Sequence, residues 1–215
     1  EVKVTKDIFW NGYRELKSVW KLLEHNRSIK RFLPAFFIYS MSLQTVLLVA
    51  AYFGEEEIDW GSAGAKTTGL IVSILLIQLV GVIGAILTAK ASKHFGNLKV
   101  LIVINLIWAG LCFYAYHIHT PIEFYAVAGM VGMVMGGLQA LSRSTYSKLI
   151  PKTEDTTSFF SFYGVTEKIG IIVGMSLFGV IDQITGSMRN AILVFMIFFI
   201  AGALMLFRVP RKNLS

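Results

Sequence analysis

The chain has 215 residues, of which 55% are hydrophobic and only 15% charged, a balance that excludes an ordinary soluble domain and is typical of integral membrane proteins. Its formal net charge of +7 is compatible with nucleic-acid binding, but 17 of its 20 Lys and Arg residues lie in segments on one side of the predicted membrane spans. Such one-sided charge places the basic side in the cytoplasm. We therefore expect a multi-pass membrane protein with both termini cytoplasmic and no nucleic-acid partner.

Residues 1–32 are predicted to form a cytoplasmic amphipathic linker helix. Within them, apolar side chains recur every three or four positions, at Phe9, Tyr13, Leu16, Trp20 and Leu23. This stripe favours a helix lying on the cytoplasmic membrane surface, and a helix packed on a soluble partner domain is the alternative. Because the chain does not start with Met, we expect it to begin partway through a longer protein.

Six apolar segments are long enough to cross the bilayer, whose hydrocarbon core of ~30 Å takes about 20 helical residues. We place them at 33–53, 67–89, 100–116, 122–141, 159–184 and 190–207. Residues 33–207 would then form a six-helix transmembrane bundle, followed by a cytoplasmic tail at 208–215. The sequence therefore predicts an all-α membrane protein.

Polar side chains interrupt the first three spans. The first span contains Tyr39 and Gln44, the second Gln78 and the third Asn105. Such residues either line a cavity or, as is more common for single polar residues, form hydrogen bonds between helices. His117 and His119 follow the third span, and we interpret them as interfacial polar residues because the sequence offers no further metal ligands beside them.

The fourth and fifth spans are rich in glycine. Gly132 and Gly136 form a G-x-x-x-G pair, Gly129 extends the same face, and Gly170 and Gly174 repeat the spacing in the fifth span. Small residues at this spacing let two helix backbones approach closely in lipid, where packing replaces the hydrophobic effect as the driving force. We expect these glycines to lie at helix–helix contacts.

Two neighbouring charged residues, Glu167 and Lys168, lie inside the apolar run of the fifth span. Each costs roughly 2.5 to 3.5 kcal/mol on insertion scales, so such residues normally face a bundle interior or a water-filled path. They point about 100° apart around the helix, so one would face the cavity and the other a neighbouring helix. Both a role in substrate binding or coupling and a structural ion pair are open for them.

Gln139 and Arg143 share one face at the cytoplasmic end of the fourth span because they are four residues apart. Arg143 either pairs with an acidic group of the next helix or extends to the phosphate headgroups. The stretch from the fourth to the fifth span is therefore the main functional candidate.

Several segments carry a family resemblance. They are RFLPAFFIYSMSLQT, QLVGVIGA, GGLQALSRS followed by LIP, SFYGVTEKIGIIVG and FGVIDQITGSMRNAI. In this order the chain resembles the C-terminal half of a major facilitator superfamily transporter, in its vacuole-effluxer-like branch, which includes autophagy-related amino-acid effluxers. The resemblance implies the second six-helix bundle of a twelve-helix carrier, with a solute cavity near the bilayer midplane between the two halves.

The resemblance further implies secondary active transport of small solutes such as amino acids by alternating access, in a bacterial cytoplasmic (inner) membrane. The expected partners are the lipid bilayer, the N-terminal six-helix half, a small-molecule solute and, as a coupling ion, the proton. We expect the substrate and coupling residues to be Tyr39, Gln44, Gln78, Asn105, Gln139, Arg143, Tyr163, Glu167 and Lys168.

The alternative is an intramembrane interaction or sensor module without transport activity, in which the glycine-rich helices bind another membrane protein. An intramembrane enzyme lacks support, because the sequence has no paired-His metal motif, no Ser and His at a shared depth and no nucleotide-binding loop. We therefore expect no catalytic residues, no metal site and no cofactor.

Overall fold

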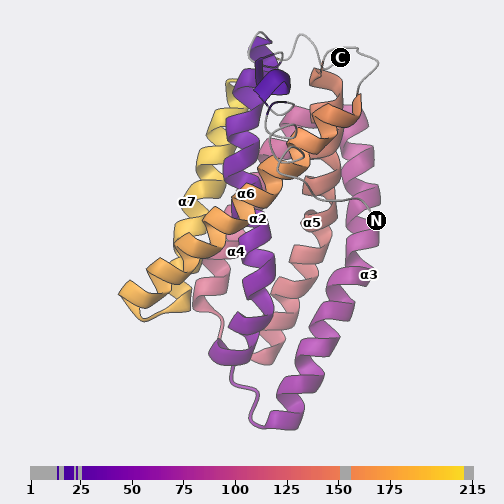
Figure 1. Cartoon of the computed structure of the whole chain (residues 1–215). Helices are drawn as coiled ribbons and strands as arrows, with labels where there is room; N and C mark the ends of the chain where they lie inside the picture. The colour runs from indigo at the N-terminus through magenta and orange to yellow at the C-terminus, as the bar shows by residue number, and fades with distance from the viewer. Residues whose placement is uncertain (1–13, 15–16, 22, 24–25, 151–155, 211–215) are drawn as a thin grey trace, which may run out of the picture.

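The computed structural model describes residues 14, 17–21, 23, 26–150 and 156–210, which form six long helices and no strand. All six are long and apolar enough to cross a membrane. The predicted all-α fold with six spans, which is that of a major facilitator half, is therefore confirmed. Figure 1 shows the helices as α2 (Arg27–Glu57), α3 (Ala63–Phe95), α4 (Asn97–His117), α5 (Pro121–Leu149), α6 (Thr156–Thr185) and α7 (Met188–Phe207).

The helices extend beyond the predicted spans because polar caps, rather than the limits of the apolar runs, fix several of their ends. The Asn26 side chain accepts a hydrogen bond from the Ser28 backbone N–H at 3.0 Å, so α2 begins at Arg27, inside the segment assigned to the linker. Thr120 and Glu123 form a capping box at the start of α5.

Only part of the predicted linker helix lies among the described residues. Val19 and Leu23 are buried there, whereas Trp20 is 41% exposed and stacks on Phe162 of α6 with ring centroids 6.1 Å apart. The other positions of the apolar stripe, Phe9, Tyr13 and Leu16, lie outside the described residues. The linker and tail boundaries therefore stay predictions.

The buried core lies between α2, α4, α5 and α7, where α7 packs on both α2 and α4 and α5 packs on α4, and its largest side chains are aromatic. Trp108 of α4 stacks on Phe199 of α7 with centroids 5.4 Å apart, and Phe36 of α2 stacks on Tyr163 of α6 at 4.2 Å. In Figure 1, α6 crosses α2 obliquely while the other helices run along the long axis of the bundle. This places residues of α2, α5 and α6 next to each other midway along the bundle.

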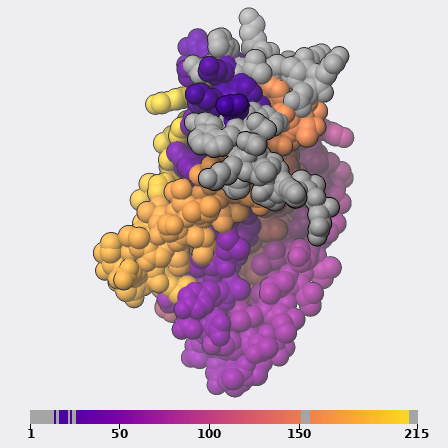
Figure 2. All heavy atoms as spheres, in the orientation of Figure 1, coloured from indigo at the N-terminus to yellow at the C-terminus, as the bar shows by residue number. Residues whose placement is uncertain are grey.

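Two helices stand at the surface of the bundle. Only 11% of the most apolar stretch of α3 and 17% of that of α6 are buried, against 61% in α2. Figure 2 shows the lower part of α6, in orange, projecting from the side of the molecule. These helices leave apolar surface for lipid or for another helical unit to cover.

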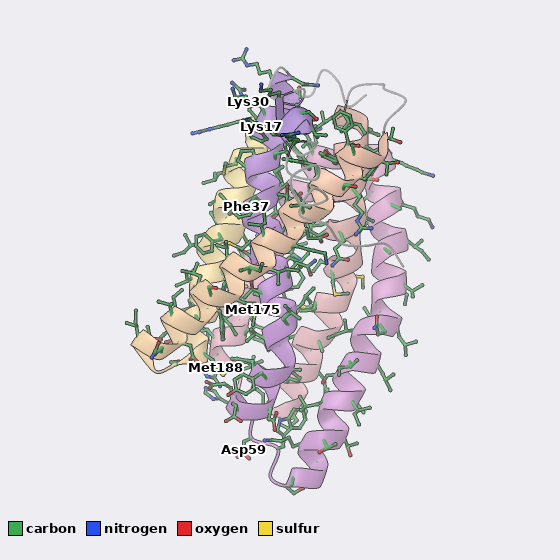
Figure 3. All side chains as sticks on the ribbon, in the orientation of Figure 1. Lys17, Lys30, Phe37, Asp59, Met175 and Met188 are labelled. Carbon is green, nitrogen blue, oxygen red and sulfur yellow. The ribbon has the colours of Figure 1, made fainter. Side chains whose placement is uncertain are left out.

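The two ends of the bundle differ in charge. Figure 3 shows Lys17 and Lys30 at the end where α2 begins and Asp59 at the opposite end, and Glu55, Glu56 and Glu57 close α2 there. The positive-inside rule predicts that the Lys17 end is the cytoplasmic one. We refer to the two ends below as the cytoplasmic and the outer end.

The glycine face of α5 packs against α3 within the chain. A Cβ built on Gly132 would lie 2.7 Å from the Ile77 carbonyl oxygen, and one on Gly84 of α3 would collide with the Met133 backbone. The place of a Cβ on Gly136 is 3.6 Å from the nearest atoms of α3, an ordinary contact distance, and Gly129 has only Leu76 at 3.9 Å.

The glycines of α6 pack on α2. A Cβ on Gly174 would overlap the Thr45 hydroxyl and lie 2.9 Å from the Met41 side chain, whereas one on Gly170 would make ordinary contacts with Met41 at 3.5 Å. The close approach of these helices therefore requires glycine at Gly84, Gly132, Gly137 and Gly174, whereas Gly129, Gly136 and Gly170 have room for a methyl group.

Candidate functional site

Glu167, midway along α6, is the centre of a polar cluster that joins three helices. Its Oε1 accepts a hydrogen bond from Nε2 of Gln44 in α2 at 2.7 Å, and its Oε2 lies 4.0 Å from Nη2 of Arg143 in α5. The Glu167 side chain is 18% exposed and that of Arg143 65% exposed. The pairing of Arg143 with an acid of the next helix is thus the arrangement observed, at the long limit of an ion pair.

Tyr163 lies one helical turn before Glu167 and belongs to the same cluster. It interacts electrostatically with both Glu167 and Arg143, and its ring packs against Phe36 and against Tyr146, whose centroid is 5.1 Å away. We refer to Gln44, Arg143, Tyr163 and Glu167 as the Glu167 cluster. It offers a carboxylate, a guanidinium, an amide and a phenol at one place, on three helices that are far apart in sequence.

Two other candidates are buried inside the bundle. Tyr39 is 1% exposed, and its hydroxyl lies 2.8 Å from Ser142 Oγ, which itself donates to the Leu138 carbonyl. Asn105 is fully buried and its amide donates to the Leu101 carbonyl within α4. The structure therefore places Tyr39 and Asn105 among packed side chains and does not bring them into the Glu167 cluster.

Three further candidates point elsewhere. Gln78 of α3 and Lys168 of α6 are exposed on the bundle surface, and Gln139 of α5 is half-buried. No hydrogen bond or ion pair joins any of them to another residue in the described part of the chain. Glu167 and Lys168 thus point in different directions, as their spacing predicts: Glu167 faces α2 and α5, and Lys168 faces outward.

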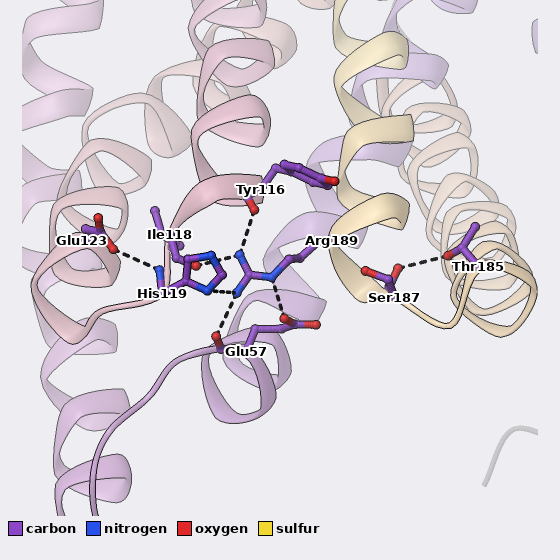
Figure 4. Close-up of polar contacts among 8 residues, drawn as sticks. All are labelled: Glu57, Tyr116, Ile118, His119, Glu123, Thr185, Ser187 and Arg189. Carbon is purple, nitrogen blue, oxygen red and sulfur yellow. Dashed lines mark hydrogen bonds and ion pairs between the residues drawn. The ribbon is translucent and has the colours of Figure 1, made fainter.

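At the outer end, Arg189 of α7 holds the ends of three helices together, an arrangement that sequence reasoning missed (Figure 4). Its guanidinium donates to the Glu57 carboxylate at 2.6 Å and the Glu57 carbonyl at 2.9 Å, and to the carbonyls of Tyr116 at 2.8 Å and Ile118 at 2.7 Å. It also lies 3.3 Å from His119 Nδ1. Arg189 thus caps the C-terminal ends of α2 and α4 from the first turn of α7.

The two histidines of the outer end have separate environments. His117 Nδ1 lies 3.0 Å from the Phe113 carbonyl, whereas the His119 ring faces Arg189. Among the described residues, no group of three or more His, Cys, Asp or Glu side chains is placed to hold a metal ion.

Six apolar helices, charged groups held between them at mid-depth and one-sided basic charge together define a multi-pass membrane protein of the transporter type. The sequence profile described as "Vacuole effluxer Atg22 like" matches residues 1–214. The chain belongs to this family. The resemblance to the vacuole-effluxer branch of the major facilitator transporters is therefore confirmed.

Curated relatives agree with this assignment. The chain is 29% identical over 212 residues to "Uncharacterized MFS-type transporter YxiO" of Bacillus subtilis, covering 99% of this chain and 48% of the relative. It is 29% identical to "Autophagy-related protein 22" of Eremothecium gossypii, covering 90% of this chain and 41% of that protein. The same-named protein of Saccharomyces cerevisiae strain S288c is 28% identical, with 95% and 39% covered.

The chain thus spans about half the length, or less, of the curated relatives it matches. No solved structure matches it significantly.

Proposed function

We propose that this chain forms one half of the solute pathway of a secondary active transporter that works by alternating access. The observation that supports this proposal is the Glu167 cluster, in which an intramembrane carboxylate is held by Gln44 of α2 beside Arg143 of α5. A charge at this depth is costly, and in membrane proteins it normally serves a pathway for ions or solutes. The cluster joins α2, α5 and α6, so the binding of a solute to it would depend on the positions of these helices relative to one another.

The chemistry of the cluster suits a small solute that carries both charges. The Arg143 guanidinium is largely exposed and has donors for a carboxylate, while the Glu167 carboxylate accepts from an ammonium group. An amino acid has this charge pattern, and we propose amino acids or similar zwitterions as the substrate class.

The partner in this proposal is a second six-helix unit, the N-terminal half of the same transporter. The weakly buried surfaces of α3 and α6 are where such a unit would pack, and the exposed Lys168 and Gln78 would then face it. In that arrangement Lys168 is a second candidate for solute or proton coupling. We further propose the bacterial cytoplasmic membrane as the location and the absence of enzyme activity.

The interaction-module alternative receives less support. The glycine face of α5, which suggested a binding surface, is filled by α3 within the chain, since Gly132 lies against Ile77 and Gly136 against Ala85. It is therefore not free to bind another protein. The Glu167 cluster, by contrast, contains the Arg143 guanidinium, whose side chain stays 65% exposed although it lies 4.0 Å from Glu167.

Solute-dependent thermal stabilisation of the full-length protein tests the proposal. A ligand that binds only the folded state raises the apparent stability by RT ln(1 + [L]/Kd), so even weak solutes become visible at high concentration. We expect stabilisation by amino acids that is lost in Glu167→Gln and in Arg143→Gln and retained in Asp182→Asn. A folded protein that no solute of a broad panel stabilises would contradict the proposal.

A further inference from the structure

A cavity lies at the cytoplasmic end, between the end of α3, the start of α4 and the end of α5. Its volume is about 570 Å³, and it shares no lining residue with the Glu167 cluster. We refer to it as the basic cavity. Its lining residues are Ala85, Thr88, Ala89, Ser92, Lys93, Gly96, Asn97, Gly137, Ala140, Leu141, Ser144 and Lys148.

The charge of this cavity is uncompensated within the described structure. Lys93 and Lys148 supply two ammonium groups, and none of the described lining residues is acidic. Neither lysine forms a hydrogen bond or ion pair with another residue that the structure describes. Two like charges beside one cavity repel each other, so an anion between them would be stabilised.

Hydrogen-bond donors accompany the lysines. Thr88 is only 9% exposed and lines the cavity, and its hydroxyl has no hydrogen-bond partner among the described residues. Its position is fixed by close packing, because the Thr88 side chain occupies the space that a Cβ on Gly137 would need. The Thr88 hydroxyl is not among the buried side-chain atoms that lack a partner, so it is open to the cavity, where a ligand oxygen would accept its hydrogen bond.

The N-terminal end of α4 also favours an anion in the basic cavity. Gly96, with φ of 85°, precedes the helix, and no side chain caps it. The first N–H groups of α4 therefore have no capping partner, and Gly96 and Asn97 bring them to the edge of the cavity. Helix N-termini with free N–H groups stabilise phosphate and other anions.

An apolar groove lies on the neighbouring faces of the same two helices. Its volume is about 410 Å³, and its lining residues are Ala91, Phe95, Lys99, Val100 and Val103. Ala91 and Phe95 follow Thr88 and Ser92 by three residues each, so the groove and the basic cavity are about 60° apart around α3. A ligand with an anionic head and an apolar tail would fit both.

We propose that the basic cavity binds the phosphate of an anionic phospholipid from the cytoplasmic leaflet. Lys93 and Lys148 neutralise the phosphate, Thr88 and the start of α4 donate hydrogen bonds to it, and an acyl chain lies along Phe95 and Val103. Basic pockets between helices at the cytoplasmic surface are the usual places for such headgroups. The site is independent of the solute pathway proposed above, because none of its residues belongs to the Glu167 cluster.

Native mass spectrometry of the full-length protein in detergent tests this site, with phosphatidylglycerol, phosphatidylcholine and inorganic phosphate as separate probes. We expect one phosphatidylglycerol to be retained in preference to phosphatidylcholine. The double variant Lys93→Gln/Lys148→Gln should weaken its binding about 30-fold. The matched control Lys30→Gln/Lys90→Gln removes two exposed cytoplasmic charges that do not line the cavity, and should leave binding within about twofold.

A second variant covers the case in which the double variant misfolds. Thr88→Val keeps the side-chain volume and all charges, and should weaken phosphatidylglycerol binding about fivefold through the lost hydrogen bond. If the double variant and its control lost phosphatidylglycerol binding equally, the lipid would be held by the overall positive charge of this end, and the proposed site would be overturned. If the protein retained inorganic phosphate and showed no preference for phosphatidylglycerol, the ligand of the cavity would be a free anion and the lipid proposal would be overturned. Cross-linking of Lys148 to the other half of the transporter, with lipid excluded, would make the cavity an interdomain contact.

Discussion

Replacement of Arg189 should destabilise the outer end of the bundle more than any other single change in charge. Arg189→Gln removes the donors for the Glu57 carboxylate and for three backbone carbonyls. The ion pair is largely buried, because the side chain of Arg189 is only 11% exposed and that of Glu57 23% exposed. Breaking a buried pair costs about 3 to 5 kcal/mol because one charge is left without a partner. Since water reaches part of Glu57, we expect the lower end, about 3 kcal/mol, which corresponds to a ratio of roughly 150 in the unfolding equilibrium.

Cys112 provides the assay for this change. It is the only thiol of the chain and 2% exposed, so a thiol reagent modifies it only when the bundle opens. When reclosing is fast, the labelling rate follows the open population, and Arg189→Gln should be labelled roughly 150 times faster than the parent.

Two variants control the Cys112 assay. Arg189→Lys keeps the charge but not the planar set of donors, so its labelling rate should lie between those of the parent and Arg189→Gln. Lys66→Gln removes an exposed ion pair with Glu55 at 3.3 Å and should change the rate less than about fivefold. A labelling rate of Arg189→Gln within about threefold of the parent would refute the reasoning.

Two further predictions concern packing between helices. Gly84→Ala should destabilise the α3–α5 contact by about 2 kcal/mol, because its methyl group would collide with the Met133 backbone. Gly81→Ala on the same helix should be neutral or stabilising, because its methyl group would lie 3.6 Å from the nearest atom. Thermal unfolding of both variants in detergent would show this difference. Tyr39→Phe removes the hydrogen bond to Ser142 but leaves Ser142 bonded to the Leu138 carbonyl, so chemical unfolding should show a loss of only about 1 kcal/mol, and a loss above about 3 kcal/mol would contradict this assignment.

The sequence predicted the six spans and the exceptional position of Glu167 because each depends on local composition, whereas the orientation inferred from loop charge stays a prediction. An apolar run, a biased loop charge and a carboxylate within a span are all visible without knowing which helices touch. The glycine spacing likewise predicted close contacts, but not that α3 is the partner of α5, since the same spacing serves any neighbouring helix.

The sequence could not separate cavity residues from core residues. Lipid-facing and buried positions are both apolar in a membrane protein, so the polar Tyr39 and Asn105 look the same as Gln44 until the helices are placed. The role of Arg189 was also not predictable, because its acceptors come from two helix ends more than 70 residues away in the chain. Long-range contacts of this kind follow from the packing and not from any motif.

Solute exchange by the full-length protein in liposomes, compared between Glu167→Gln and Asp182→Asn, tests the central claim most directly. Both variants remove one carboxylate charge from α6, but only Glu167 contacts Gln44 and Arg143. We predict that Glu167→Gln abolishes exchange of the solute found by thermal stabilisation while the protein stays folded, and that Asp182→Asn exchanges as the parent does. Undiminished exchange by folded Glu167→Gln would contradict the claim that the Glu167 cluster belongs to the solute pathway.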